Sequence, residues 1–258
     1  LADLVQALAR CVRLGQTRDR EPLTDCHSAV ITWASSGIGN ALAFELAARG
    51  YTLGLASRRS SRLQDIRDAL LAKHPGVKVE LAELAVDQVD TVQASLDDLI
   101  ARMGGADVVV VNAGVNRLTG VGRGQLEDEL QILQTNVRGA VATIEAASAH
   151  FLSRGRGQLV GVSSLAAENP IPKQAAYCAS KAALSMYLDI ARMELSRKGI
   201  GVTTILPGFV TPRSHVRRIR SPCSRHSLEV ARADHAPWFG DLVLHGKARR
   251  LSPLQGDS

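Results

Sequence analysis

The alternation of short apolar strand patterns with helical patterns between residues 29 and 211 is the feature that most constrains the fold of this chain. The apolar runs fit strands that are buried on both faces, and the segments between them carry apolar residues at helical spacing. Strands that alternate with helices form a parallel sheet covered by helices on both faces. We therefore predict an α/β fold with a single doubly wound parallel sheet and no domain boundary within residues 29–211. The strands are expected at 29–32, 52–56, 77–81, 106–111, 158–163 and 201–206, and the helices near 41–48, 61–73, 89–102 and 125–154 and in a segment that ends near residue 198.

The length and composition of the chain favour one large globular domain. Its 258 residues are 45% hydrophobic, which suffices for a sizeable core. The chain has no apolar run long enough to span a membrane, and residues 1–14 lack the pattern of a signal peptide. These two observations favour a cytoplasmic location. The four cysteines show no CxxC spacing, so we expect reduced thiols and no metal site.

The positive charge of the chain is concentrated near its end. The formal net charge is +6, but residues 212–258 hold nine Lys or Arg against four Asp or Glu, whereas residues 1–211 hold 22 against 21. A nearly neutral main body and an aromatic content of 3% argue against a nucleic-acid-binding protein. We expect no nucleic-acid partner.

Both ends of the chain depart from the strand and helix pattern. Residues 1–28 begin with apolar positions at helical spacing and continue into a polar stretch, which indicates a helical extension and linker, or else sequence without fixed structure. Residues 212–258 lose the periodicity and gain arginines, although a short helix at 227–233 and a short strand at 241–245 fit the sequence. We interpret this atypical basic segment as poorly ordered or derived from a shifted reading frame. The alternative is a lid that selects an anionic substrate.

The turn between the first strand and the first helix has the composition of a phosphate-binding loop. It reads Thr-Trp-Ala-Ser-Ser-Gly-Ile-Gly over residues 32–39. The amides and the dipole of a helix N-terminus attract a pyrophosphate, and glycines let the backbone approach it. Such a turn is weak support for a site when it stands alone.

Tyr177 and Lys181 lie four residues apart in a segment of helical pattern. On a helix this spacing places a phenol and an ammonium on one face, about 5–6 Å apart at Cβ. A cation beside a phenol favours the phenolate and so lowers its pKa. The pair is therefore a candidate general acid and base for proton transfer near neutral pH.

These motifs stand in the order that characterises one enzyme family. With Asn-Ala-Gly at 112–114 after the fourth strand and Ser164 before Tyr177, residues 29–211 resemble a short-chain dehydrogenase/reductase. The resemblance implies a Rossmann-like domain that binds a nicotinamide cofactor. It also implies hydride transfer between that cofactor and a carbonyl or secondary alcohol.

The end of the second strand indicates which cofactor is preferred. An acidic residue about 20 residues beyond the glycine turn would bind the ribose 2′-hydroxyl of NAD, whereas an arginine would pair with the 2′-phosphate of NADP. Ser57, Arg58 and Arg59 stand there, without an acid. NADP(H) is therefore favoured over NAD(H). The alternative is that both arginines face solvent.

The resemblance assigns catalytic roles to four residues. Ser164 would orient the substrate oxygen, although the neighbouring Ser163 is a second candidate. Tyr177 would donate the proton to that oxygen. Lys181 would lower the pKa of Tyr177 and contact the nicotinamide ribose, and Asn136 would position a water that leads to Lys181. The cofactor-binding residues that we expect are Thr32, Ser35, Ser36, Gly37, Ile38, Gly39, Arg58, Arg59, Asn112, Ala113, Gly114, Tyr177, Lys181, Pro207, Gly208, Val210 and Thr211.

Two positions depart from the pattern of the family. The first glycine of the family's turn is Trp33 here, and an indole at this position is expected to displace the turn or to crowd the adenosine side of the cofactor. The family usually has an acidic residue after the third strand, facing the adenine. Ala85 aligns best with that position, and Glu83 or Asp87 would serve with a shifted register.

We predict an NADP(H)-dependent oxidoreductase that interconverts a carbonyl and a secondary alcohol of a small molecule, with Tyr177 as general acid and base. The alternative is a nucleotide-binding or scaffold protein that keeps the fold but has impaired catalysis because of Trp33 and the C-terminal segment. The resemblance further implies a homodimer or homotetramer.

Overall fold

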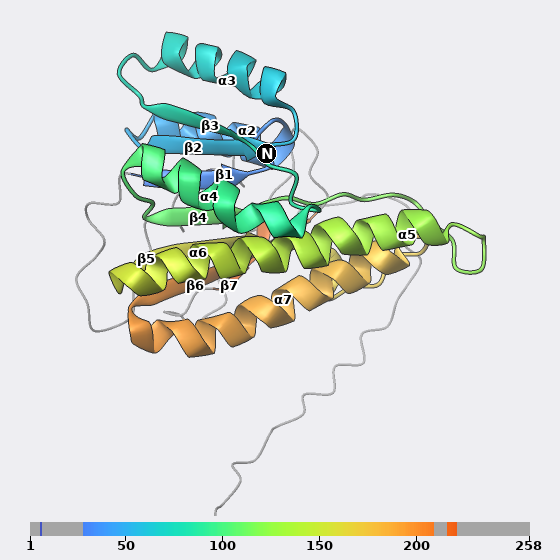
Figure 1. Ribbon diagram of the computed structural model, residues 1–258. Helices are drawn as coiled ribbons and strands as arrows, with labels where there is room; N and C mark the ends of the chain where they lie inside the picture. The colour runs from blue at the N-terminus through green and yellow to red at the C-terminus, as the bar shows by residue number, and fades with distance from the viewer. Residues whose placement is uncertain (1–5, 7–27, 209–215, 221–258) are drawn as a thin grey trace, which may run out of the picture.

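The computed structural model describes residue 6, residues 28–208 and residues 216–220 (Figure 1). Its strands are β1 (Ser28–Thr32), β2 (Thr52–Ser57), β3 (Val79–Glu83), β4 (Val108–Val111), β5 (Gly157–Val162), β6 (Ile200–Pro207) and β7 (Val216–Arg220). They form one sheet in the order β3-β2-β1-β4-β5-β6-β7. All neighbouring strands from β3 to β6 are parallel, and β7 runs antiparallel to β6. The six parallel strands confirm the predicted α/β class.

Helices cover both faces of the sheet (Figure 1). One face carries α2 (Gly37–Ala47) and α3 (Ser60–Lys73), and the other carries α4 (Val89–Met103), α6 (Ala140–Arg154) and α7 (Ala175–Leu195). Successive residues of β1 serve opposite faces, since Ile31 packs into the core cluster of α2 and α3, and Val30 packs into that of α4, α6 and α7. Because both faces are buried, the strands read as continuous apolar runs.

The strand order reverses between β1 and β4. The chain passes from β1 to β2 and β3 on one side, and α4 leads it back to β4 on the other side. Loops that leave the carboxyl ends of two such strands diverge, which creates a crevice at this edge of the sheet. The glycine turn follows β1, Asn112 follows β4 and Ser164 follows β5, so all three lie at this edge.

The predicted helix over 125–154 is interrupted. α5 (Leu126–Leu133) is joined to α6 by a π-helical segment, Gln134–Gly139, that contains Asn136. At the end of this segment the backbone runs against the loop after β3, where a Cβ on Gly139 would lie 2.7 Å from the carbonyl oxygen of Val86. The remaining helices and parallel strands occur where the sequence predicts them and differ at their ends.

β7 has no counterpart among the strands expected from the sequence. Its backbone pairs with residues 204–207 of β6 across an irregularity between Leu206 and Pro207, so the sheet extends beyond residue 211. Apart from residues 6 and 28, the predicted N-terminal extension lies outside the described residues. The same holds for the helix expected at 227–233 and the strand expected at 241–245.

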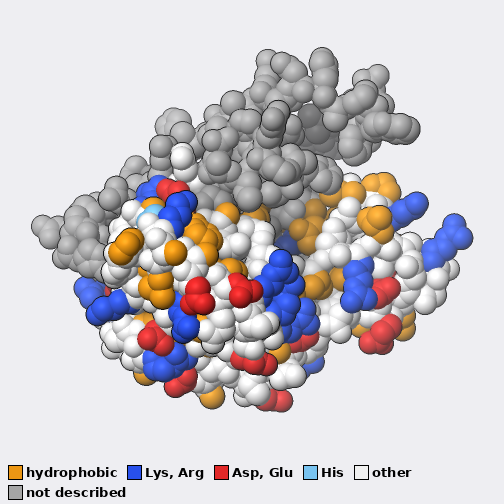
Figure 2. Space-filling model, turned by 90° about the horizontal axis from the view of Figure 1, so that it is seen from above, with side chains coloured by type: hydrophobic (Ala, Val, Ile, Leu, Met, Phe, Trp, Pro, Cys, Tyr) orange, Lys and Arg blue, Asp and Glu red, His pale blue; other side chains and the backbone are white. Residues whose placement is uncertain are grey.

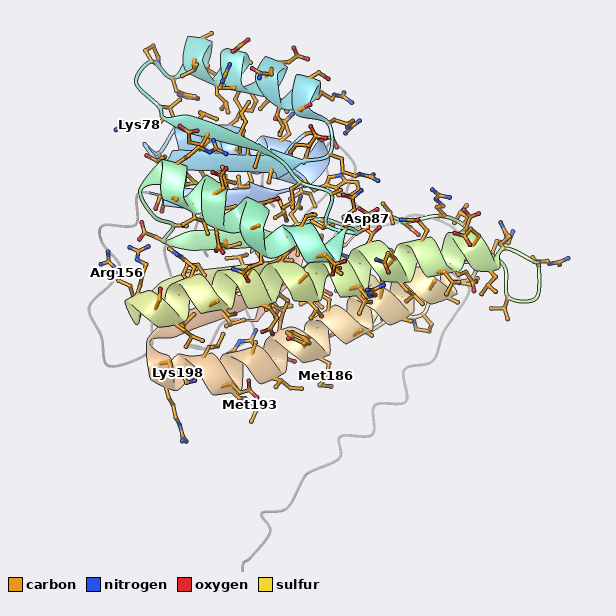
Figure 3. The ribbon with its side chains drawn as sticks, in the orientation of Figure 1. Lys78, Asp87, Arg156, Met186, Met193 and Lys198 are labelled. Carbon is orange, nitrogen blue, oxygen red and sulfur yellow. The ribbon has the colours of Figure 1, made fainter. Side chains whose placement is uncertain are left out.

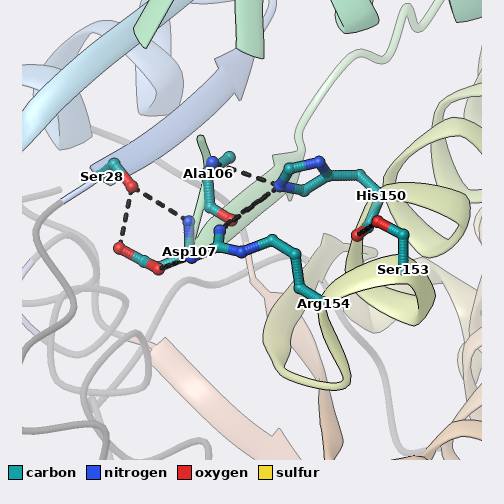
Figure 4. A network of polar contacts seen from close by, with 6 residues as sticks. All are labelled: Ser28, Ala106, Asp107, His150, Ser153 and Arg154. Carbon is teal, nitrogen blue, oxygen red and sulfur yellow. Dashed lines mark hydrogen bonds and ion pairs between the residues drawn. The ribbon is translucent and has the colours of Figure 1, made fainter. Parts of the chain in front are cut away.

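A polar network ties the amino end of β4 to its neighbours, at the edge of the sheet opposite the glycine turn (Figure 4). The Asp107 carboxylate accepts hydrogen bonds from the Ser28 hydroxyl at 2.8 Å and from the Arg154 guanidinium at 3.1 Å. The His150 ring nitrogen Nε2 lies 3.1 Å from the carbonyl oxygen of Ala106. Burial lowers the pKa of His150, and the neighbouring Arg154 cation also lowers it. These contacts fasten the end of α6 to β4 and β1.

The surface of the described part mixes charges of both signs. Figure 2 shows Lys and Arg side chains interspersed with Asp and Glu on the face that it presents. Within the described ranges, no helix combines the length and the apolar character needed to cross a membrane. The same residues contain no group of three or more His, Cys, Asp or Glu placed to hold a metal ion.

Candidate active site

The glycine turn between β1 and α2 forms the first wall of the site. The helix starts at Gly37, and its N-cap residue, Ser36, makes no side-chain capping bond. The first amides of a helix have no intrahelical acceptors, so they point toward the space in front of α2. Gly39 lets this turn pass close to β4, because a Cβ there would lie 2.7 Å from the Asn112 side-chain nitrogen and 2.8 Å from the Trp33 carbonyl oxygen.

Trp33 stands in this turn in a left-handed backbone conformation. Its φ of 56° is left-handed, the conformation that the family's glycine would adopt at no steric cost. The turn is held on both sides, since the Ala34 amide donates to the Ala56 carbonyl at 3.1 Å and the Asn112 side chain donates to the Trp33 carbonyl at 3.4 Å. The half-buried indole packs partly against the core and lines the cavity. The indole therefore forms part of the cavity wall, and the expectation that it displaces the turn or crowds the cofactor stays a prediction.

The two arginines at the end of β2 have different partners. The Arg59 guanidinium donates to the Ser35 hydroxyl at 3.0 Å and to the Ser36 hydroxyl at 3.3 Å. The Arg58 guanidinium carbon lies 4.8 Å from the centre of a Trp33 ring. Its Nη1 atom lies 3.8 Å from an oxygen of Asp87. Both side chains therefore have protein partners, although both residues are also exposed to solvent, so their role in phosphate binding stays a prediction.

Asp87 is the acidic residue after β3 that reaches this region. The Gln134 side chain donates to the Asp87 carbonyl oxygen at 2.7 Å, so the loop after β3 is held against the π-helical segment (Figure 3). The carboxylate of Asp87 is half-buried beside Arg58, whereas Glu83 is exposed. Of the two acidic candidates, Asp87 is the one that contacts Arg58, and the role of either beside the adenine stays a prediction.

The hydroxyls of the two serines after β5 have different hydrogen-bond partners. The Ser163 hydroxyl donates to the Lys181 carbonyl oxygen at 3.0 Å and lies 2.7 Å from the Ser185 hydroxyl, so it ties β5 to α7. The Ser164 hydroxyl accepts from the Ala166 amide at 3.1 Å and also hydrogen-bonds with the Tyr177 phenol. Ser164 is thus the serine that contacts Tyr177.

Lys181 is buried beneath Tyr177. Its Nζ atom donates to the Val162 carbonyl oxygen at 2.9 Å and lies 5.9 Å from the centre of the Tyr177 ring. Burial lowers the pKa of Lys181 to about 8. Burial also raises the pKa of Tyr177, and the hydrogen bond from Ser164 opposes this rise. The pKa of Tyr177 is therefore raised overall, through burial and Cys178, and the hydrogen bond from Ser164 is what lowers it. The lowering by Lys181 that the resemblance implies stays a prediction.

Asn136 is buried and clamps the loop after β4 to α7. Its side-chain oxygen accepts from the Val115 amide at 2.7 Å, and its side-chain nitrogen donates to the Val115 carbonyl at 2.8 Å and to the Ser180 hydroxyl at 3.0 Å. The loop passes close to the lysine, since a Cβ on Gly114 would lie 3.1 Å from the Lys181 Nζ atom. Asn136 therefore holds the wall of the cavity next to Lys181.

A cavity of about 520 Å³ connects these walls. Its lining includes ten residues expected from the sequence, namely Ser36, Gly37, Ile38, Asn112, Gly114, Ser164, Tyr177, Lys181, Pro207 and Gly208. Seven other expected residues stand behind or beside the lining, namely Thr32, Ser35, Gly39, Arg58, Arg59, Ala113 and Asn136. Val210 and Thr211 lie outside the described residues.

Comparison with known proteins decides the family. A family model described as short chain dehydrogenase matches residues 27–221. The chain belongs to the short-chain dehydrogenase/reductase family. This confirms the resemblance in motif order, and it establishes an oxidoreductase of this family.

Solved relatives of this chain include one with NAD⁺ bound and one complexed with 5-hydroxy-NADP. An uncharacterized oxidoreductase of Myxococcus xanthus (strain DK1622) is 45% identical over 183 residues, which cover 71% of this chain and 72% of the relative. An NAD⁺-bound xylitol dehydrogenase has a TM-score of 0.69 and 27% identity, covering 72% of this chain and 71% of its own. An alcohol dehydrogenase of the archaeon Thermococcus sibiricus, complexed with 5-hydroxy-NADP, has a TM-score of 0.66 and 29% identity, covering 71% of this chain and 77% of its own.

The cavity of this short-chain dehydrogenase fits a nicotinamide cofactor. Glycines stand at positions 39 and 114, where any larger residue would bring its Cβ against the side chain of Asn112 or Lys181. The amides at the start of α2 suit the pyrophosphate, and Tyr177 and Lys181 line the same cavity. The residues present therefore suit the charge of such a group.

Three residues that form hydrogen bonds with the site were not predicted in that role from the sequence. The Val162 carbonyl accepts from Lys181, but a backbone acceptor has no signature in the sequence. Ser180 holds Asn136, and its place directly before Lys181 was the available signal. Ser163 is expected from the sequence only as a substitute for Ser164, and its contacts with Lys181 and Ser185 depend on the packing of α7.

Proposed function

We propose that the protein is an NADP(H)-dependent oxidoreductase that interconverts a carbonyl and a secondary alcohol of a small molecule. The observation that carries this proposal is that Ser164, Tyr177 and Lys181 line one cavity with the glycine turn of α2. A proton donor, a hydroxyl that orients the substrate and an anion site then stand along a single bound cofactor.

Tyr177 is the proton donor in the direction of reduction. A bound nicotinamide cofactor supplies the hydride that adds to the carbonyl carbon. The Ser164 hydroxyl donates a hydrogen bond to the substrate oxygen, and the Tyr177 phenol transfers its proton to that oxygen as charge develops there. The raised pKa of Tyr177 keeps the phenol protonated at neutral pH, so the proton is available. In oxidation the same oxygen of Tyr177 takes the alcohol proton.

The preference for NADP(H) is supported by the charges at the end of β2. Ser57 ends the strand, Arg58 and Arg59 follow, and Arg59 reaches the serines of the glycine turn. A guanidinium pairs with a phosphate and has no acceptor for a ribose hydroxyl proton. Two of the solved relatives carry different cofactors, so the preference rests on the positive charge at the end of β2.

Assembly into a homodimer or homotetramer is supported by an apolar stripe on α7. Met186, Ile190 and Met193 recur at helical spacing and are 63%, 49% and 77% exposed. Met186 and Met193 point away from the sheet (Figure 3). We also place the enzyme in the cytoplasm, on the basis of its sparse and unspaced cysteines.

The alternative, a nucleotide-binding scaffold without turnover, is less well supported because the catalytic side chains and the glycine turn share one cavity. Titration with NADPH, followed by measurement of NADPH consumption with a panel of aldehydes and ketones, separates the two. The proposed function predicts binding and turnover. Binding without turnover on any carbonyl would favour the scaffold, and absence of binding would contradict both.

A further inference from the structure

The two neighbouring arginines at the end of β2 are not equivalent as phosphate ligands. Arg59 reaches only neutral hydroxyls, those of Ser35 and Ser36, and within the described part of the chain no carboxylate forms an ion pair with it. Its charge is therefore uncompensated beside the glycine turn. Arg58, in contrast, has both an aromatic ring and a carboxylate as partners.

The contact between Trp33 and Arg58 holds the second arginine. A guanidinium carbon 4.8 Å from the ring centre is within the range of a cation–π interaction, for which tryptophan is the best side chain. Asp87 lies 3.8 Å from the same guanidinium and partly neutralises it. Arg58 thus lies between the indole of Trp33 and the carboxylate of Asp87, whereas Arg59 contacts the serine hydroxyls of the turn.

Trp33 occupies a position that permits this contact at a conformational cost. A left-handed φ is unusual for a bulky residue, and the family's glycine would avoid the strain. A glycine has no ring, so it would leave Arg58 with Asp87 as its remaining partner in this region. The indole is therefore the feature that distinguishes the environment of Arg58 from that of Arg59.

We propose that Trp33 is a specificity-determining residue that acts through Arg58. By stacking on the guanidinium it withholds Arg58 from the cofactor, so that Arg59, with Ser35 and Ser36, binds the 2′-phosphate and alone distinguishes NADP(H) from NAD(H). This inference rests on the proposed function. It predicts that discrimination between the two cofactors increases when the indole is removed, because a second guanidinium then becomes available to the phosphate.

Isothermal titration of NADPH and NADH tests the proposal, because the two ligands differ only in the 2′-phosphate. The readout is the ratio of the two dissociation constants, which needs no turnover. Arg59→Gln should bring the ratio close to one, and Arg58→Gln should leave it unchanged. Trp33→Gly should raise the preference for NADPH by about tenfold, the effect of one added charge-assisted hydrogen bond.

A double-mutant cycle assigns the effect to the stacked pair. In Trp33→Gly/Arg58→Gln the added preference should disappear. Trp33→Asn provides a second variant, since asparagine tolerates a left-handed φ and has no ring. It should also raise the preference.

Three results would overturn the proposal. In the first, Trp33→Gly and Trp33→Asn strengthen NADPH and NADH binding equally, which would show that the indole only takes up space. In the second, Arg58→Gln lowers the ratio as much as Arg59→Gln does. In the third, the wild-type protein binds neither ligand, and this result alone would contradict the proposed function as well.

Discussion

At the scale of single residues, the hydroxyls of Ser163 and Ser164 show how one step along the chain changes a role. Side chains at successive strand positions point to opposite sides. The Ser163 hydroxyl is therefore taken up by α7, where it meets Lys181 and Ser185, and the Ser164 hydroxyl faces Tyr177. The first serine stabilises the packing of a strand on a helix, and the second is free to orient a substrate oxygen.

Substitution of each serine by alanine should separate these roles. Ser164→Ala should lower kcat by about 10²–10³-fold, the usual effect of removing one donor to a developing oxyanion. Ser163→Ala, the matched control, should keep kcat but lower the free energy of unfolding by about 1 kcal/mol, because a buried hydrogen bond is lost. NADPH consumption and urea denaturation measure the two quantities. Equal losses of kcat in both variants would contradict this assignment.

Lys181 makes the stability of the protein depend on pH in the alkaline range. Burial lowers its pKa from 10.5 to about 8. Between these two values the unfolded chain binds more protons at this residue than the folded protein does, so this residue makes the folded state more stable as the pH rises. Below pH 8 both states are protonated, and the burial of the charge then carries its full cost.

The variant Lys181→Met removes this titration. Relative to the variant, the wild-type protein should gain roughly 3 kcal/mol of unfolding free energy between pH 8 and pH 10.5. Urea denaturation of both proteins at several pH values measures the difference, and the other titrating groups cancel because both proteins share them. A difference that stays constant over this range would show that Lys181 keeps its ordinary pKa.

At the scale of secondary-structure elements, the network of Asp107, His150 and Arg154 joins α6 to the amino end of β4 (Figure 4). Burial lowers the pKa of His150 and the nearby Arg154 cation adds to this, whereas the hydrogen bond with the Ala106 carbonyl raises it. The Asp97 and Asp107 carboxylates act in the opposite direction but more weakly. Protonation of His150 would place a second cation beside Arg154 at this junction.

Acid should therefore weaken the folded protein through His150. Its folded pKa lies below the unfolded value of about 6.5, so the unfolded state takes up the proton first and stability falls as the pH drops through this region. His150→Gln should flatten the dependence of the unfolding free energy on pH between about 7 and 5. Denaturation curves of the two proteins measure this. A wild-type curve parallel to that of the variant would contradict it.

Most elements could be predicted from the sequence because their patterns are local. β1, β2 and β4 are short apolar runs buried on both faces, and Gly50 and Gly104 lie at left-handed positions after α2 and α4. The π-helical segment Gln134–Gly139 and β7 could not be predicted in this way. The first depends on the close approach of Gly139 to Val86, and the second on pairing with β6. Both are contacts between distant parts of the chain.

At the scale of the whole molecule, the site could be predicted as a set of residues but not as a set of contacts. The order of the glycine turn, Asn112, Ser164 and Tyr177 places them at one edge of the sheet, because parallel strands end there. The partners of each side chain depend on tertiary packing, and the order of the motifs in the sequence does not specify this packing. The sequence marks Trp33 as an obstacle, whereas the fold seats it in the turn and stacks Arg58 on it.

In the proposed reaction Tyr177 is the group that transfers the proton. Its phenol lines the cavity beside Ser164 and above Lys181. Tyr177→Phe keeps the ring and removes only the hydroxyl, so cofactor binding and folding should be preserved.

The most direct test measures NADPH binding and carbonyl reduction by Tyr177→Phe beside the wild-type protein. We predict that kcat falls by about 10²–10⁴-fold, as expected for the loss of a general acid, while the dissociation constant for NADPH changes by less than about twofold. A variant that binds NADPH normally and still reduces the carbonyl at the wild-type rate would contradict the central claim.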